Sequence, residues 1–278
     1  MKKLFLPISG ILILIAIVLT FKQILFPPAM TPAYFVAPYE KSKSVVKKLK
    51  KAGFSIVSTS KVGKKKMDLV IFTHPKLERL SDQKSRGFLY GALRVLVNKK
   101  AKEIRISNPN YILPAFLQET YQDGQADEFA QMIQKAFPKA IYSKDKWAED
   151  SLSSFQYMIG MPGYQDVSIL AEGNVSDLVK KLDKKVKKKD LIFKYELSEN
   201  RFIYGIMPGK RTAKFVDKIG SQNALVLPWM ILIEDNKAMA FDGKYYIALS
   251  YPLLSMDQFM KIATVPGAIE KDMKKLVK

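Results

Sequence analysis

The stretch SVVKKL, residues 44–49, decides the fold, because a close copy, SDLVKKL, returns at residues 176–182. Both copies place apolar residues at helical spacing with lysines between them, which predicts a helix with one buried stripe and one cationic face. Each predicted helix follows a short strand pattern and precedes two alternating segments typical of a hairpin. The shared order of strand, helix, hairpin, helix, strands, proline and helix predicts a tandem duplication.

The two copies also end alike, since RISNP at 105–109 matches ALSYP at 248–252. In the second copy, Asp242-Gly243 between two apolar segments predicts a type I′ turn of a hairpin. A KKL match can arise by chance in a lysine-rich chain, so the shared order carries more weight than the letters. We therefore predict an α+β fold class, in which an N-terminal transmembrane helix is followed by two tandem copies of a small α+β sandwich unit.

The membrane segment is predicted from residues 4–21, which carry no charge and would form a helix of roughly 27 Å, close to the thickness of a bilayer core. A cleaved signal peptide is the alternative, although Thr31 and Ala33 offer it a weak cleavage site. Lys2 and Lys3 precede the apolar segment, and no Lys or Arg lies within 23–40. This asymmetry predicts a single-pass protein of the cell inner membrane, with its C-terminal domains on the periplasmic or extracytoplasmic side.

Changes in composition along the chain predict the domain boundaries. The predicted parts are a transmembrane anchor (1–26), a Pro-rich spacer (27–36), a first α+β repeat (37–121), a helical connector (122–164), a second α+β repeat (165–262) and a basic tail (263–278). The connector is more acidic than the remainder of the chain and has a helical pattern at 126–136. We interpret it as a packing element without chemistry of its own.

The charge of the chain favours anionic partners, because 46 Lys and Arg residues against 26 Asp and Glu residues give a net charge of +20. The residues predicted to contact an anionic surface are Lys47, Lys48, Lys51, Lys180, Lys181, Lys184 and Lys185. A solvated surface that keeps the protein soluble is the alternative interpretation of these lysines. No aromatic residues accompany them on the polar helix faces, so nucleic acid is not an expected partner.

Catalytic chemistry finds little support in the sequence. The chain has no cysteine and one histidine, which excludes disulfides, thiolate sites and clustered imidazole metal sites. His74 precedes Pro75 at a strand end and could act as a general base or as a lone metal ligand, but a structural histidine is the preferred interpretation. The GMPG stretch at 160–163 lacks the GK[ST] ending of a phosphate-binding loop. We expect no cofactor and no metal site, and the catalytic residues of any activity are unknown.

Four stretches resemble a family without an assigned activity, known as domain of unknown function family 302. They are THPKL (73–77), GALRVLV (91–97), RISNPNY (105–111) and GMPGYQD (160–166). The resemblance covers most of residues 34–262 and implies a small α+β fold. It supplies no catalytic residues.

These observations favour a membrane-anchored extracytoplasmic protein that acts as a non-catalytic binding or protein-interaction module. Its expected partners are the membrane and a protein. A basic peripheral surface that binds anionic lipid is the alternative, and an enzyme using His74 is the third hypothesis.

Overall fold

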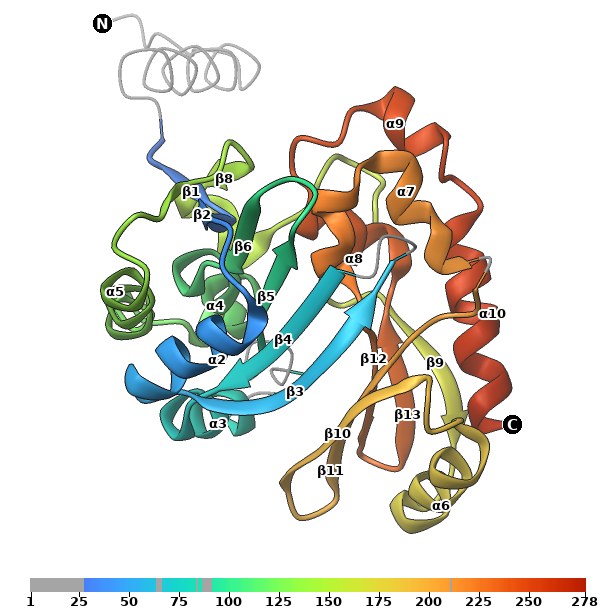
Figure 1. The fold of residues 1–278 in the computed structure, drawn as a ribbon. Helices are drawn as coiled ribbons and strands as arrows, with labels where there is room; N and C mark the ends of the chain where they lie inside the picture. Colours follow the sequence, from blue (N-terminus) through green and yellow to red (C-terminus); the bar gives the residue numbers. More distant parts are fainter. Residues whose placement is uncertain (1–27, 64–66, 84, 87–91, 211) are drawn as a thin grey trace, which may run out of the picture.

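The computed structural model describes residues 28–278 except 64–66, 84, 87–91 and 211, and places them in three antiparallel sheets and surrounding helices (Figure 1). The first large sheet has the order β3-β4-β5-β6-β2-β7, and the second has the order β10-β11-β12-β13-β9. A third sheet pairs β1 with β8.

The bounds of the strands are β1 (Met30–Pro32), β2 (Tyr34–Pro38), β3 (Ser55–Val62), β4 (Met67–Thr73), β5 (Leu93–Asn98), β6 (Glu103–Ser107), β7 (Ile141–Tyr142), β8 (Lys146–Ala148), β9 (Val167–Glu172), β10 (Leu191–Ser198), β11 (Arg201–Ile206), β12 (Trp229–Glu234) and β13 (Lys237–Phe241). The α-helices are α2 (Ser42–Lys51), α3 (Pro75–Asp82), α4 (Pro109–Leu117), α5 (Asp127–Ala136), α6 (Val175–Lys185), α7 (Phe215–Ile219), α8 (Gly243–Ser250), α9 (Met256–Met260) and α10 (Val265–Val277). The 3-10 helices among the described residues are η2 (Gln118–Thr120), η3 (Glu149–Ser154), η4 (Thr212–Lys214) and η5 (Ser221–Val226).

The first half (28–164) and the second half (165–278) share a strand order, because β3-β4-β5-β6-β2 corresponds to β10-β11-β12-β13-β9. Helix α2 packs against α5 and covers β3 and β4, as α6 packs against α10 and covers β12 and β13. Val45 and Leu49 are the buried residues of α2 and lie on one side of the helix. After the helix the chain turns at Gly53, which has the left-handed conformation (φ +98°). Leu178 and Leu182 bury the same side of α6.

The two halves contact each other through corresponding residues of α4 and α8. The third residue of α4, Tyr111, donates a hydrogen bond to the carbonyl of Leu249, at 2.9 Å. The third residue of α8, Tyr245, reaches the carbonyl of Ala115 at 3.5 Å, and Ala115 and Leu249 are each the seventh residue of their helix. The two halves therefore pack with approximate two-fold symmetry.

The ends of the central strands repeat this pattern. Asn98, the last residue of β5, donates to Ser221 Oγ in η5 (3.4 Å). Glu234, the last residue of β12, accepts hydrogen bonds from Ser85 Oγ (2.5 Å) and from the backbone N–H of Arg86 (2.9 Å). Every residue of β5 and β12 is buried, and each half forms hydrogen bonds with the end of the other half's central strand.

The predicted fold class is wrong: the described chain is a mixed α/β fold with three sheets, and not a transmembrane helix followed by two separate sandwich units. The two halves are not separate units because both contribute to one continuous hydrophobic core, so neither buries its own sheet alone. Over the described part of the chain, no helix has the length and apolar character needed to cross a bilayer. The predicted anchor at 1–26 lies outside the described residues.

The predicted hairpin at Asp242-Gly243 is also wrong. Asp242 caps helix α8, since its Oδ1 accepts from the backbone N–H of Lys244 (2.7 Å). An Asp-Gly pair serves a helix start as well as a turn, and the apolar stretch after it is buried on nearly all sides as a helix. The strand-to-helix stretch 105–109 consequently corresponds to 239–243 and not to 248–252.

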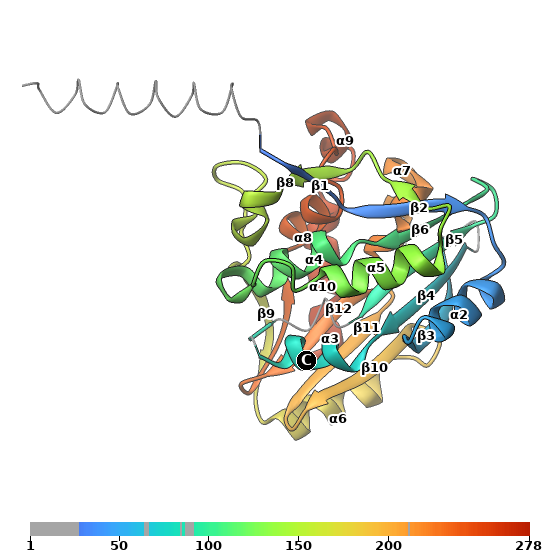
Figure 2. The same ribbon diagram turned by 90° about the vertical axis from the view of Figure 1, so that its left-hand side faces the viewer.

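Two stretches predicted without regular structure also form elements. The stretch 263–278, interpreted as a basic tail, contains α10, which packs on α6, α8 and β9 through Val265, Ile269 and Met273. Within the predicted spacer, Met30–Pro32 forms β1 and lies beside β8 (Figure 2).

Candidate binding cleft

A cavity of about 770 Å³ opens in the first half between β1, the start of α4, the chain after η2, and η3. Four carboxylates line it, those of Asp123, Asp127, Glu149 and Asp150, and the described residues around it include no Lys, Arg or His. This local charge is opposite to that of the chain, whose net charge is +20. The cavity is within the size range of small-molecule sites.

Backbone pairing brings the carboxylates together from two segments. Strand β1 pairs with β8, and the backbone N–H of Glu149 then donates to the carbonyl of Ala29 (2.8 Å), which places the start of η3 beside the entering chain. On the other side, Gly124 takes a left-handed conformation (φ +77°) that turns the chain between Asp123 and Asp127. The acidic rim is therefore built by turns and caps, and not by the large sheets.

The side of the cavity next to α4 contains an acceptor without a donor. Asn108 caps α4 and donates from Nδ2 to the carbonyl of Pro32 (2.7 Å). Asn110 donates from Nδ2 to Asp127 Oδ1 (2.9 Å), and the reverse amide orientation would place two oxygens in contact. The Oδ1 of Asn110 is buried and has no hydrogen-bond partner among the described residues. A buried acceptor of this kind favours a ligand that donates N–H groups.

The electrostatic effect of the carboxylates is visible at Tyr121, another residue of the cavity wall. Burial raises the pKa of Tyr121 above its ordinary value; a hydrogen bond with the backbone of Ala126 lowers it, and the charges of Asp127, Asp123 and Glu149 raise it. Three carboxylates thus act on one point of the wall. Within the described chain, none of the four cavity carboxylates forms an ion pair.

The cleft offers acceptors and aromatic surface. Its carboxylates and the Asn110 carbonyl accept hydrogen bonds, while Tyr121 and Tyr142 present rings that a cation can contact. No three His, Cys, Asp or Glu side chains among the described residues lie close enough together to hold a metal ion. The arrangement is suited to bind an organic cation with several N–H donors.

The lysines predicted to contact an anionic surface form two separate sets, on α2 of the first half and on α6 of the second (Figure 1). Lys48 is engaged within the protein, since its Nζ lies 2.5 Å from Glu40 Oε1 and 5.5 Å from the ring centroid of Phe137. Lys180 lies 4.0 Å from Asp177. The other five are exposed and have no ion-pair partner in the described chain: Lys47, Lys51, Lys181, Lys184 and Lys185.

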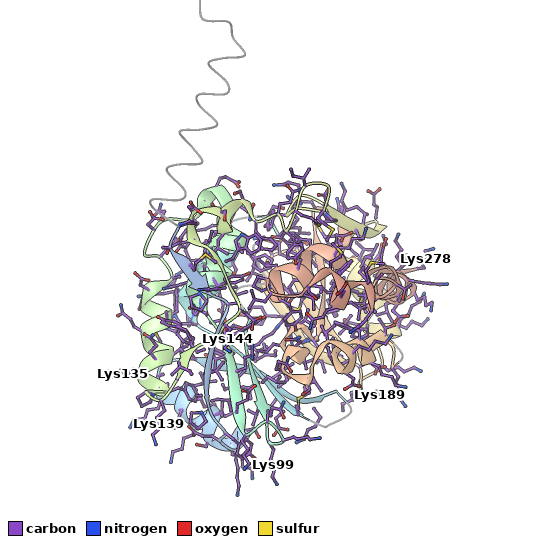
Figure 3. The ribbon with its side chains drawn as sticks, turned by 90° about the horizontal axis from the view of Figure 1, so that it is seen from above. Lys99, Lys135, Lys139, Lys144, Lys189 and Lys278 are labelled. Carbon is purple, nitrogen blue, oxygen red and sulfur yellow. The ribbon has the colours of Figure 1, made fainter. Side chains whose placement is uncertain are left out.

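Other lysines surround the molecule as well. Of those labelled in Figure 3, Lys144 lies over the middle of the view and the others lie along the outline of both halves. A cavity of about 230 Å³ below the end of α6 combines Lys185 with four lysines outside the prediction: Lys187, Lys189, Lys210 and Lys275. Lys210 and Lys275 are distant in sequence from α6, so helical periodicity could not place them there.

His74 has a structural role in the first half. Its Nδ1 accepts a hydrogen bond from the backbone N–H of Lys76 (3.2 Å) and so caps α3. Its ring lies between those of Phe54 and Phe129, at centroid distances of 6.1 and 5.6 Å. The sequence analysis places possible chemistry at His74 and none in 122–164, yet this acidic segment supplies all four carboxylates of the cleft. The signal for the cleft was the excess of acidic residues within a basic chain.

No protein-family model matches the chain, and neither the curated proteins nor the solved structures contain a match. The resemblance to domain of unknown function family 302 therefore stays a prediction.

Proposed function

We propose that the protein is a non-catalytic binding module whose acidic cleft takes an organic cation with ammonium or guanidinium groups. The observation that carries this proposal is the cavity of about 770 Å³ whose described lining has four carboxylates and no basic side chain. The unpartnered Oδ1 of Asn110 adds a further acceptor at the same place.

The expected affinity is modest, because the carboxylates are exposed to solvent. An exposed ion pair contributes about 0.2–1 kcal/mol, so three or four pairs together supply about 1–4 kcal/mol. Such an interaction weakens as salt shortens the Debye length to about 8 Å at physiological ionic strength. The proposal therefore requires binding that is selective for cations and sensitive to salt.

A thermal-unfolding screen tests this function. The full chain is heated with spermidine, arginine methyl ester, a neutral polyol of similar size or an anionic dicarboxylate, at low and at physiological salt. A ligand that binds the folded protein raises the Tm. We expect a rise with the two cations that diminishes with salt, and none with the polyol or the dicarboxylate. Equal effects of all four compounds would overturn the proposal.

Reversible contact with an anionic bilayer is a second candidate function, favoured by the five-lysine cavity below α6. Each Lys near an anionic surface contributes about 1 kcal/mol. Co-sedimentation with phosphatidylglycerol vesicles is expected to fall when Lys185, Lys187 and Lys189 are changed to Gln. The same triple change at Lys99, Lys100 and Lys102 is the control. Equal, salt-insensitive partitioning to phosphatidylglycerol and phosphatidylcholine would exclude this candidate.

A further inference from the structure

Arg94, in the middle of β5, is a buried cation at the contact between the halves. The residue is 6% exposed, and its charge is permanent. Its Nη1 donates to the carbonyls of Leu225 (2.9 Å) and Val226 (3.3 Å) and to the hydroxyl of Tyr246. All three partners are neutral, and no carboxylate of the described chain forms an ion pair with Arg94. A buried charge without an opposite charge is costly.

A small cavity of about 30 Å³ lies beside this guanidinium group. Its lining includes Tyr34, Arg94, Ser107, Tyr246 and Ser250. The Nε of Arg94 is buried and has no acceptor among the described residues.

Two hydroxyl groups add donors to the cavity lining. Ser107 Oγ accepts from the backbone N–H of Arg94 (3.3 Å), and Tyr246 Oη accepts from Nη1. Neither hydroxyl donates its own proton to another atom of the described chain, so both protons are available to a ligand. Tyr34, by contrast, donates its proton to the carbonyl of Ser250 (2.5 Å). The cavity wall therefore carries up to three donors, one of them charged.

We propose that this cavity binds one monatomic, monovalent anion of the halide class, chloride being the abundant example. A volume of about 30 Å³ admits one particle the size of a water molecule and excludes polyatomic anions such as sulfate. A halide accepts hydrogen bonds from all the donors and neutralises the guanidinium charge. A water molecule would leave that charge uncompensated. The site is independent of the acidic cleft.

The second half contains an apolar counterpart of this site. The strand registers align Arg94, opposite Ile71, with Met230, opposite Gly205. Methionine is therefore tolerated at the corresponding position of the same sheet order. This makes Arg94→Met a test substitution that resembles a side chain already present in the fold, and a buried charge replaced by an apolar side chain of similar volume is often tolerated.

Thermal unfolding of the full chain in sodium chloride and in sodium gluconate, at equal ionic strength, tests the proposal. We expect chloride to raise the Tm in a saturable manner by at least about 2 °C. Arg94→Met is expected to abolish the difference between the two salts. Arg79→Met, which removes an exposed arginine on α3, is the control and should retain the difference.

If Arg94→Met does not fold, Tyr246→Phe removes a single hydroxyl donor and is expected to weaken the chloride dependence. A crystal grown in sodium bromide supplies a direct observation on the unmodified protein. We expect one anomalous peak within hydrogen-bonding distance of Arg94 Nε. Equal Tm values in both salts, or a water molecule without bromide at Nε, would overturn the proposal.

Discussion

The two halves of the molecule share a sheet order and differ in what surrounds it. In both halves a helix follows the strand at one end of the shared order (β2 or β9), and a tyrosine reaches the opposite half. The first half adds the acidic segment 118–164, with β7, β8 and η3, and this segment forms most of the cleft. The second half instead has the lysines below α6, and its α10 packs on α6 as α5 packs on α2. The shared part builds a body with one core, and the unshared parts supply the candidate sites.

The largest predicted loss of stability comes from variants at the contact between the halves, and these variants test whether the halves unfold together. Replacing Tyr111 or Tyr245 by Ala removes a fully buried ring between α4 and α8 and should cost about 3–5 kcal/mol. Urea denaturation followed by circular dichroism is expected to show one transition with a lower midpoint. Two separate transitions would contradict the single shared core.

The corresponding Phe variants sharpen the comparison between the halves. Tyr111→Phe removes a 2.9 Å hydrogen bond and should cost about 0.5–1.5 kcal/mol. Tyr245→Phe removes a longer contact of 3.5 Å and should cost less.

A second prediction concerns side-chain sizes at corresponding positions of the two sheets, where a large residue in one sheet is matched by a small one in the other. In the first half Ile71 lies opposite Ser58, whereas in the second half Gly205 lies opposite Phe193. A Cβ on Gly205 would stand 2.3 Å from the ring of Phe193, so Gly205→Ala should cost about 1–3 kcal/mol.

The matched control for this prediction is Phe193→Ala combined with Gly205→Ala. The loss of stability in the double variant should be smaller than the sum of the two single losses, because the small side chain removes the clash. Additive losses in urea denaturation would show that the ring and the glycine are not coupled.

The smallest effect is the pH dependence from His74. Burial lowers the pKa of His74 below its ordinary value of 6.5, so the folded state prefers the neutral ring. The contribution of the neutral His74 ring to the free energy of unfolding is fully present above about pH 6.5. It is lost as the pH falls from there through the pKa of His74 in the folded state. His74→Asn keeps an acceptor for the cap of α3 and should reduce this loss. Identical pH profiles of stability for both proteins, between about pH 7 and 5, would contradict the assignment.

Local patterns in the sequence correctly predict several helices and strands, although the fold class predicted from them is wrong. The stripes of Val45 and Leu49 and of Leu178 and Leu182 indicate α2 and α6, and alternation indicates the paired strands β3 and β4. Asp242-Gly243 was misinterpreted because a helix cap and a hairpin turn use the same residues. Packing decides between the two, and packing is not visible in one segment.

The candidate site is harder to predict from the sequence than the helices and strands are. Asp123 and Glu149 are 26 positions apart, and the pairing of β1 with β8 brings their segments to one cavity. That pairing involves strands of three residues, which are too short for a periodic signal. The excess of acidic residues was visible, but its position around a cavity was not.

The most direct test of the cation-binding cleft is isothermal titration calorimetry with spermidine on three forms of the full chain. The cleft variant combines Asp123→Asn, Asp150→Asn and Glu149→Gln, and retains Asp127, which bonds Asn110. The control variant makes the same charge change at exposed positions elsewhere, with Asp235→Asn, Asp257→Asn and Glu199→Gln. We predict that the cleft variant loses affinity by about 10-fold or more while the control stays within about two-fold of the unmodified protein. Equal affinity in all three forms would contradict the cleft as the binding site.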